Sequence, residues 1–405
     1  TGIEAFYDSL LRGQSGAVTQ FRDAKGTLLG EPETTDPVIG ASLHLTIDAE
    51  FQNYFFDRFE AGLRSLGRIS GVGLAMDPRN GEVLALFNFP TFDNNLFVAS
   101  GRNEEKQELL QSPNRPLFNR AVAGFYNPGS TIKPLVGIAA LAEGVISPER
   151  ELFSPGYLDV PNPYNPEQPT RYLDWRYQGN VDLSAALAQS SNVYFYTVAG
   201  GFGDVKGIGI TRLHQWWERF GLGKATGIDL PAEAEGLLPT PEYKEDKTGR
   251  PWLLGDTYNV GIGQGDLLLT PIQILNYTSA IANGGALYQP FLNGGTQPRL
   301  QANVAAPPSS MNEVRQGMVE AVEAPLGTAY VLNDLPFAVA AKTGSAQVRN
   351  NTQENAFFIG YAPAHDPEIA ILVLVENSKE GSLNTLPIAK DVLNWYYNKR
   401  INTNK

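Results

Sequence analysis

Apolar residues are arranged differently at the two ends of the chain and in its middle. Short apolar runs that predict strands cover residues 71–76, 82–87, 337–341, 356–361 and 369–375. The first two runs are separated by residues 77–81, which contain Pro and Gly and predict a hairpin turn. The middle is richer in helical patterns. This arrangement predicts an α+β fold, in which an antiparallel sheet is assembled from both chain ends and flanked by helices.

Helical spacing marks two of the helices that would cover such a sheet. Phe51, Phe55 and Phe59 recur one helical turn apart after Asp48, a residue type that caps helix N-termini. Residues 387–400 show the same periodicity near the C-terminus. The first forty or so residues are instead polar and rich in turn residues, with a strand expected at 17–21.

Composition narrows the classes of function. Of the 405 residues, 42% are hydrophobic and 18% are charged, which is typical of a globular protein. The net charge of −12 argues against a nucleic acid partner, because binding phosphates requires clustered Lys and Arg. The chain has no Cys, which excludes thiol catalysis, disulfides and thiolate metal sites. It also has no apolar run of about 18 residues that would predict a transmembrane helix.

A serine and a lysine three residues apart are the first candidates for chemistry. Ser130 begins an apolar helical pattern, and Lys133 lies on the same helix face. A serine hydroxyl needs a neighbouring base to act as a nucleophile, and lysine is a base only when its amine is neutral. Lowering a lysine pKa from about 10.4 to about 7 costs roughly 4–5 kcal/mol, which burial and a helix N-terminus can supply. Taken alone, a capping serine followed by a surface lysine is the simpler interpretation.

Two further motifs could complete such a site. Ser190-Ser191-Asn192 lies between two helical patterns and supplies a hydroxyl and an amide. The segment 342–345, Lys-Thr-Gly-Ser, ends the apolar run 337–341 and could bind a carboxylate beside a nucleophile, with Gly allowing a substrate backbone to approach closely. Each also fits an ordinary turn. A second Lys-Thr-Gly, at 247–249, has no strand before it and is expected to be a solvated loop.

In this order, the three motifs resemble those of penicillin-binding proteins and class A β-lactamases. The resemblance to class B penicillin-binding proteins extends over nearly the whole chain. It is carried by residues 2–10, 45–52, 77–85, 92–95, 119–121 and 261–273. Residues 174–175, 226–231 and 255–257 are most similar to the members specific for cell elongation, with the septal paralogue as the alternative.

The resemblance implies the penicillin-binding protein/serine β-lactamase-like transpeptidase fold, with a helical subdomain beside the sheet. Residues 42–405 would form the transpeptidase domain, and residues 1–41 would be the remnant of an N-terminal pedestal. The implied function is that of a peptidoglycan DD-transpeptidase, which cross-links stem peptides through a serine acyl-enzyme, releases D-alanine and is inhibited covalently by β-lactams.

The resemblance also implies a role for each motif residue. Ser130 would be the nucleophile and Lys133 its base. Ser190 would relay a proton, while Asn192 would position Lys133 and the substrate peptide. Lys342 would provide positive potential.

The remaining implied roles concern substrate binding. Thr343 and Ser345 would hold the carboxylate of D-alanine or of the antibiotic, with Gly344 between them. The backbone N–H groups of Ser130 and Ser345 would form the oxyanion hole. Some elongation members hold zinc with Asp, His and Cys near the middle motif. This chain has no Cys and no His between Ser130 and Ser190, so neither a metal nor another cofactor is expected.

The expected partners and location also follow from the resemblance. Peptidoglycan stem peptides, β-lactam antibiotics and a membrane glycan polymerase of the elongation machinery are the implied partners. A single-pass anchor in the inner membrane, preceding Thr1, would hold the catalytic domain in the periplasm.

Other functions compete with this interpretation. A Ser-His-Asp hydrolase fits poorly, because there is no Gly-x-Ser-x-Gly and each histidine has a structural explanation. His44 is expected in a strand, His214 in an amphipathic stretch with Trp216 and Trp217, and His365 in a loop. A non-enzymatic β-lactam sensor of the same fold stays open, because a sensor would also be acylated.

A β-lactamase would need a glutamate that activates water. The string Glu-x-x-Leu-Asn of the class A enzymes occurs here from Glu380 to Asn384, but it follows the Lys342 motif instead of preceding it. We interpret this segment as a loop leading into the last helix, and we expect a long-lived penicilloyl adduct.

Overall fold

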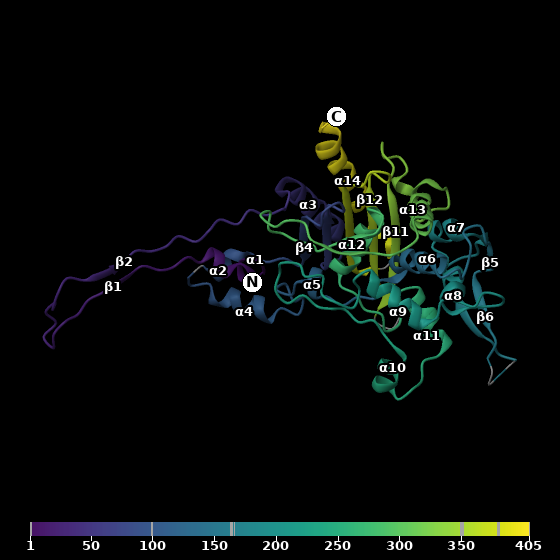
Figure 1. Ribbon diagram of the computed structural model, residues 1–405, viewed down its shortest axis with the longest axis horizontal. Helices are drawn as coiled ribbons and strands as arrows, with labels where there is room; N and C mark the ends of the chain where they lie inside the picture. The colour runs from purple at the N-terminus through teal and green to yellow at the C-terminus, as the bar shows by residue number, and fades with distance from the viewer. Residues whose placement is uncertain are drawn as a thin grey trace.

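The computed structural model describes residues 2–98, 100–162, 165, 167–348, 352–378 and 381–404. Its centre is a five-stranded antiparallel sheet in which strands from the two ends of the chain lie side by side (Figure 1). The sheet order is β11 (Ala340–Val348), β12 (Gln353–Ala362), β13 (Ile369–Ser378), β3 (Gly71–Met76) and β4 (Val83–Phe89). β11 therefore lies at an edge of this sheet.

Both faces of the sheet are covered, which explains why its strands read as continuous apolar runs. Along β13, Leu372 and Leu374 pack into one buried cluster, and Ile371 and Val373 pack into another. The second cluster is completed by α3 (Ala49–Ser65) and α14 (Leu386–Tyr396). The first is completed mainly by α6 (Lys133–Ala142), α8 (Asn192–Gly200), α9 (Ile210–Arg219), α12 (Pro271–Ala282) and α13 (Pro308–Glu323).

The predicted α3 and α14 are confirmed, and the local sequence explains where α3 begins. The side chain of Asp48 accepts a hydrogen bond from Phe51 N, as an N-cap does. Phe51, Phe55 and Phe59 are fully buried on the face turned to the sheet. After α14 the chain continues as a π-helical turn (Tyr397–Ile401) and a 3-10 turn (Asn402–Asn404).

The middle of the chain contains helices, as expected, but also short strands that no apolar run predicted. The helices not yet named are α4 (Asn103–Gln111), α5 (Arg120–Ala123), α7 (Leu183–Ala188), α10 (Pro241–Thr248) and α11 (Leu254–Gly261). The short strands are β5 (Leu152–Ser154), β6 (Tyr157–Val160), β7 (Thr170–Leu173), β8 (Gly179–Val181), β9 (Ala286–Tyr288) and β10 (Leu300–Asn303). β5 pairs with β8, β6 with β7 and β9 with β10, and most of their residues are partly exposed, so hydrophobicity did not reveal them.

Residues at the N-terminus form two short helices and a long hairpin that extends away from the main body (Figure 1). The elements are α1 (Gly2–Phe6), α2 (Asp8–Leu11), β1 (Ala17–Thr19) and β2 (Glu33–Thr35). Every residue of the two strands is exposed. At the base of the hairpin, the hydroxyl of Tyr7 donates a hydrogen bond to Asp229 Oδ2 at 2.7 Å, which ties the N-terminal segment to the main body.

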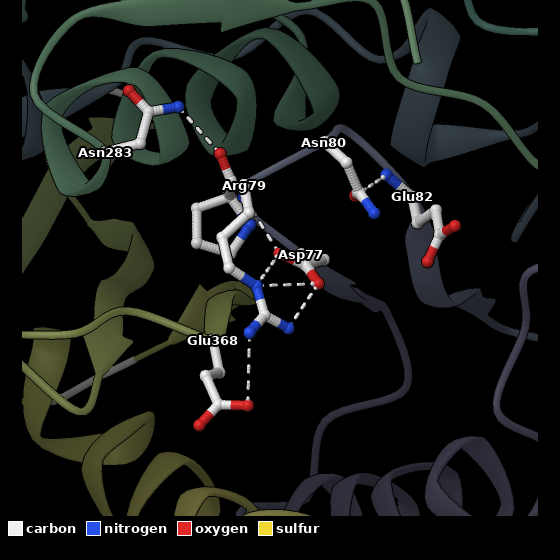
Figure 2. Close-up of polar contacts among 7 residues, drawn as sticks. Asp77, Arg79, Asn80, Glu82, Asn283 and Glu368 are labelled. Atoms are coloured by element: carbon white, nitrogen blue, oxygen red, sulfur yellow. Dashed lines mark hydrogen bonds and ion pairs between the residues drawn. The ribbon is translucent and has the colours of Figure 1, made fainter. Parts of the chain in front are cut away.

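The turn between β3 and β4 is held from three directions, as Figure 2 shows. Asp77 accepts hydrogen bonds from the backbone and the guanidinium of Arg79, which also pairs with Glu368 at 3.3 Å, just before β13. Asn283, after α12, donates to Pro78 O at 2.7 Å. The predicted hairpin is confirmed, and its turn joins the sheet to the helix that covers it.

Three local predictions were wrong. β11 begins at Ala340 and continues to Val348, so the Lys342 motif lies inside a strand and does not end one. The segment 247–249 closes α10, with Gly249 as a left-handed C-cap at φ +68°, and is not a loop. Residues 43–47 form an isolated bridge at Leu45 in place of a strand, so His44 is not in one. In each case, the hydrophobicity of neighbouring residues was not enough to predict the secondary structure that the segment adopts in the fold.

No helix in the described part of the chain combines the length and the apolar character needed to span a membrane.

Candidate functional site

Ser130 lies in a 3-10 turn, η2 (Gly129–Ile132), that leads directly into α6. Gly129 has a φ of +55°, and a Cβ there would lie 2.5 Å from Ser345 O. A Cβ on Gly344 would lie 2.8 Å from Thr131 Cγ2. These two glycines therefore allow β11 and the serine turn to pack closely. The expectation for Gly344 concerned substrate, whereas the structure gives it a role in the protein's own packing.

Lys133 is fully buried, so the interpretation of a surface lysine is wrong. Its Nζ donates hydrogen bonds to Ser190 O and to Asn192 Oδ1, each at 2.8 Å, and lies 3.3 Å from Ser190 Oγ. Burial lowers the pKa of Lys133 to about 7, and the negative charge of Asp174 opposes this shift. A substantial fraction of this side chain is therefore a neutral amine near pH 7.

Lys342 approaches the same hydroxyl from β11. It is fully buried, and its Nζ donates to Ser190 Oγ and to Thr343 O, each at 2.9 Å. Burial lowers the pKa of Lys342 well below its ordinary value, and the charge of Lys133 lowers it further. The three motifs found in the sequence thus meet at the side chain of Ser190.

Ser190 itself has a φ of +58°, which is rare for a residue other than glycine. Such strained backbone is maintained by its surroundings and is common at functional sites. Here, Asp174 Oδ2 accepts hydrogen bonds from Ser191 Oγ and Val193 N, each at 3.0 Å. Ser191 in turn caps α8 through Tyr194 N. Asp174 therefore holds the start of α8 in place.

A cleft of about 1130 Å³ opens over these residues. It is lined by members of all three motifs, namely Ser130, Ser190, Asn192, Thr343, Gly344 and Ser345. Within the part of the chain that the structure describes, the Ser130 hydroxyl makes no hydrogen bond that would hold it away from a ligand. The second Lys-Thr-Gly does not line the cleft, and its Lys247 pairs with Asp266 at 2.8 Å.

Sequence reasoning missed the groups that anchor the loop before Ser130. The hydroxyl of Tyr126 donates to Glu376 Oε1 at 2.6 Å, and Arg120 Nε donates to the same oxygen at 3.1 Å. Burial, with the nearby charge of Glu376, raises the pKa of Tyr126, so it stays a donor. Asn127 donates to Gly265 O and Leu267 O at 2.8 and 2.7 Å. Because these partners are far apart in the sequence, no motif of fixed spacing could have identified them.

The histidines take no part in this arrangement. His44, His214 and His365 are absent from the residues that line the cleft. Trp216 and Trp217, beside His214, are 2% and 0% exposed and belong to the hydrophobic core. Across the described ranges, no group of three or more His, Asp or Glu side chains is placed to hold a metal ion.

Only part of the Glu-x-x-Leu-Asn string lies within the described residues. Glu380 lies outside the described residues. Gly381 to Asn384 form a 3-10 turn before α14, and Gly381 and Leu383 line the cleft. This segment leads into the last helix, as expected, and it does so at the edge of the site.

Comparison with known proteins places this geometry in context. Residues 71–394 match the family model described as the penicillin binding protein transpeptidase domain. The chain is 34% identical over 427 residues to the peptidoglycan D,D-transpeptidase MrdA of Haemophilus influenzae, covering 99% of this chain and 63% of that protein. The chain thus spans less than two thirds of the length of this relative.

Solved structures of other proteins also match this chain over most of its length. The chain superimposes on Pseudomonas aeruginosa PBP2, solved in complex with WCK 5153, with a TM-score of 0.78 and 36% identity, covering 91% of this chain and 81% of that one. A chain from a study of polymerization and crosslinking by a peptidoglycan synthase complex matches with a TM-score of 0.82 and 32% identity, covering 98% and 70%. The predicted α+β fold is therefore the penicillin-binding protein transpeptidase fold.

Proposed function

Because this chain belongs to the penicillin-binding protein transpeptidase family, we propose that it is a peptidoglycan DD-transpeptidase acylated at Ser130. The observation that carries the proposal is the convergence of Lys133 and Lys342 on Ser190 Oγ, at 3.3 and 2.9 Å, in the cleft that Ser130 also lines. A buried amine beside a serine at a helix start is the arrangement that activates a hydroxyl for acyl transfer.

In the proposed acylation, the neutral amine of Lys133 takes the proton of Ser130 Oγ, with Ser190 as the relay. Ser130 Oγ attacks the carbonyl carbon between the two D-alanines of the donor peptide, and the backbone N–H groups of Ser130 and Ser345 stabilise the oxyanion. The C–N bond then breaks, the proton passes to the departing nitrogen of D-alanine, and an ester on Ser130 remains.

In the second half of the reaction, an amine of a neighbouring stem peptide attacks this ester. Its proton returns to Ser130 Oγ through Lys133, a new peptide bond forms and the enzyme is regenerated. A β-lactam follows the first half alone, because its leaving nitrogen stays tethered to the acyl group and occupies the cleft. Asn192 positions Lys133, and Lys342 with Thr343 and Ser345 binds the terminal carboxylate.

The position of β11 in the sheet supports the proposal that the donor peptide binds along this strand. β11 is an edge strand, and Thr343, Gly344 and Ser345 line the cleft. An extended peptide can pair with such an edge through main-chain hydrogen bonds while its terminal carboxylate meets the hydroxyls and the cation.

The direct test is labelling with a fluorescent penicillin, followed by peptide mapping of the adduct. We expect one adduct, on Ser130, and no labelling of Ser130→Ala. An adduct on another residue would contradict the proposal. Turnover of a peptide donor separates an enzyme from a β-lactam sensor, since a sensor would be labelled without turnover.

We also propose that the protein acts in cell elongation and works beside a membrane glycan polymerase. Its similarity to MrdA and to a chain of a peptidoglycan synthase complex supports this. The same similarity supports the proposal that a membrane anchor holds the catalytic domain in the periplasm. Residues 1–41 would be pedestal and 42–405 the transpeptidase domain, a division supported by the hairpin, whose two strands are exposed throughout.

A further inference from the structure

One cation on the wall of the cleft has no role in the chemistry proposed above. Arg176 lies in the loop between β7 and β8 and lines the cleft together with Trp175 and Thr328. Its Nη2 donates to Gln189 Oε1 and to Leu326 O, each at 3.1 Å. Both acceptors are neutral, so the side chain is held in place while its charge is not offset.

A second arginine on the same wall shows the contrast. Arg171 also lines the cleft, but both its Nε and its Nη2 donate to the carboxylate of Asp159, at 2.7 and 2.6 Å. Arg176 has no carboxylate within salt-bridge distance among the described residues. In a protein with a net charge of −12, an arginine that lines a cleft without an acidic partner favours the binding of an anion there.

The residues around Arg176 contact its guanidinium but leave some buried polar atoms without a hydrogen bond. Its guanidinium carbon lies 4.4 Å from the centre of the Trp175 ring, whose Nε1 donates to Gln189 O at 3.1 Å. Arg176 Nε and Thr328 Oγ1 are buried without a hydrogen-bond partner among the described residues. Buried polar atoms are normally paired, so the described residues leave this part of the cleft wall incompletely satisfied.

The chemistry of arginine selects the kind of ligand. Both protons of Arg176 Nη2 are engaged, so its Nη1, which no described residue engages, is left to donate charge-assisted hydrogen bonds, for which a carboxylate is a suitable acceptor. The terminal carboxylate of a donor peptide is already assigned to Thr343 and Ser345 on β11, which is a different wall. A second carboxylate on a peptide substrate would accept from Nη1 of Arg176.

We propose that Arg176, assisted by Thr328, is a specificity residue that binds a second carboxylate of the peptide substrates, distinct from the terminal one held at β11. This inference rests on the proposed transpeptidase function. The carboxylate belongs either to a side chain of the donor peptide or to the residue whose amine accepts the acyl group.

Two arms of one experiment distinguish these sources. In the donor arm, acylation is timed with two thioester donors that differ in one side chain, a carboxylate in one and its amide in the other. In the acceptor arm, the acyl-enzyme is partitioned between water and either D-alanine or D-alanine amide as the attacking amine. We expect the acid to be preferred over the amide by about tenfold to hundredfold in one arm.

Arg176→Gln should abolish that preference, while Arg176→Lys should keep part of it through its charge. Arg171→Gln is the matched control and should keep the full preference, because Asp159 already neutralises Arg171. Acylation of each variant by benzylpenicillin, which reports an intact Ser130 site, verifies that the variant is folded. A wild-type protein without acid preference in either arm, or a preference that persists in Arg176→Gln, would overturn the inference. Failure of benzylpenicillin to acylate the wild-type protein would instead count against the proposed function.

Discussion

Lys133 and Lys342 donate hydrogen bonds to the same atom, the hydroxyl oxygen of Ser190, although one begins a helix and the other lies on an edge strand. A serine oxygen has two lone pairs and one proton. When Lys133 is neutral, the lone pair of its amine can accept the Ser190 proton, as the proposed relay requires. Because the two amines are buried close to each other, simultaneous protonation of Lys133 and Lys342 is disfavoured.

The first prediction concerns pH. Burial lowers the pKa of Lys133 to about 7, so its amine is protonated below that pH and neutral above it. The second-order rate constant of acylation by penicillin should fall about tenfold for each pH unit below 7 and level off above it. Lys133→Ala should lower the plateau by about 10²–10⁴-fold and remove the rising limb. A rate constant that does not change between about pH 5 and pH 9 would exclude Lys133 as the base.

The second prediction compares the two Lys-Thr-Gly segments. Lys342→Ala should slow acylation by at least about tenfold, because the buried amine that donates to Ser190 Oγ at 2.9 Å is lost from the site. Lys247→Ala is the matched control. Its lysine is half-exposed and paired with Asp266, and such surface pairs are worth about 0–1 kcal/mol, so acylation should be unchanged. Equal effects of the two substitutions, measured by stopped-flow labelling, would show that the wrong segment was assigned.

The third prediction concerns Asp174, which touches the site through Ser191 and Val193. Because its negative charge raises the pKa of Lys133, Asp174→Asn should move the rising limb of the acylation profile to lower pH. Asp174→Ala also removes the hydrogen bonds to Ser191 Oγ and Val193 N and should cost about 1–3 kcal/mol of unfolding free energy.

The control for Asp174 is Asp204→Asn. Asp204 forms an exposed ion pair with Arg150, so this change should alter neither the pH profile nor the melting temperature measurably. A purely structural role for Asp174 would lower stability while leaving the midpoint of the pH profile in place.

The fourth prediction concerns the fate of the adduct. A transpeptidase lacks the glutamate-activated water of class A β-lactamases, so the penicilloyl ester on Ser130 should persist for many minutes. Intact mass spectrometry after removal of excess penicillin measures its lifetime. Loss of the adduct within seconds, abolished by Glu380→Ala, would make the protein a hydrolase of the β-lactamase kind.

Much of the fold followed from local patterns. The apolar runs of β3, β4, β12 and β13 are buried on both faces of one sheet, and the N-cap at Asp48 starts α3 where predicted. These features depend on residues within a few positions of one another, so a single sequence contains them. The identities of the motif residues, and hence the kind of chemistry available, are equally local.

The placement of those residues was decided by the tertiary structure. Complete burial turns Lys133 from an ordinary cation into a base with a pKa of about 7, and burial depends on helices and strands distant in sequence. The Lys342 motif lies within β11 because that strand borders a cleft, where polar side chains replace an apolar run. Asp174 and Arg176 had no assigned role before their neighbours were known. Motif spacing specifies which groups are present, whereas long-range packing sets their distances, solvation and charge, which together determine the chemistry.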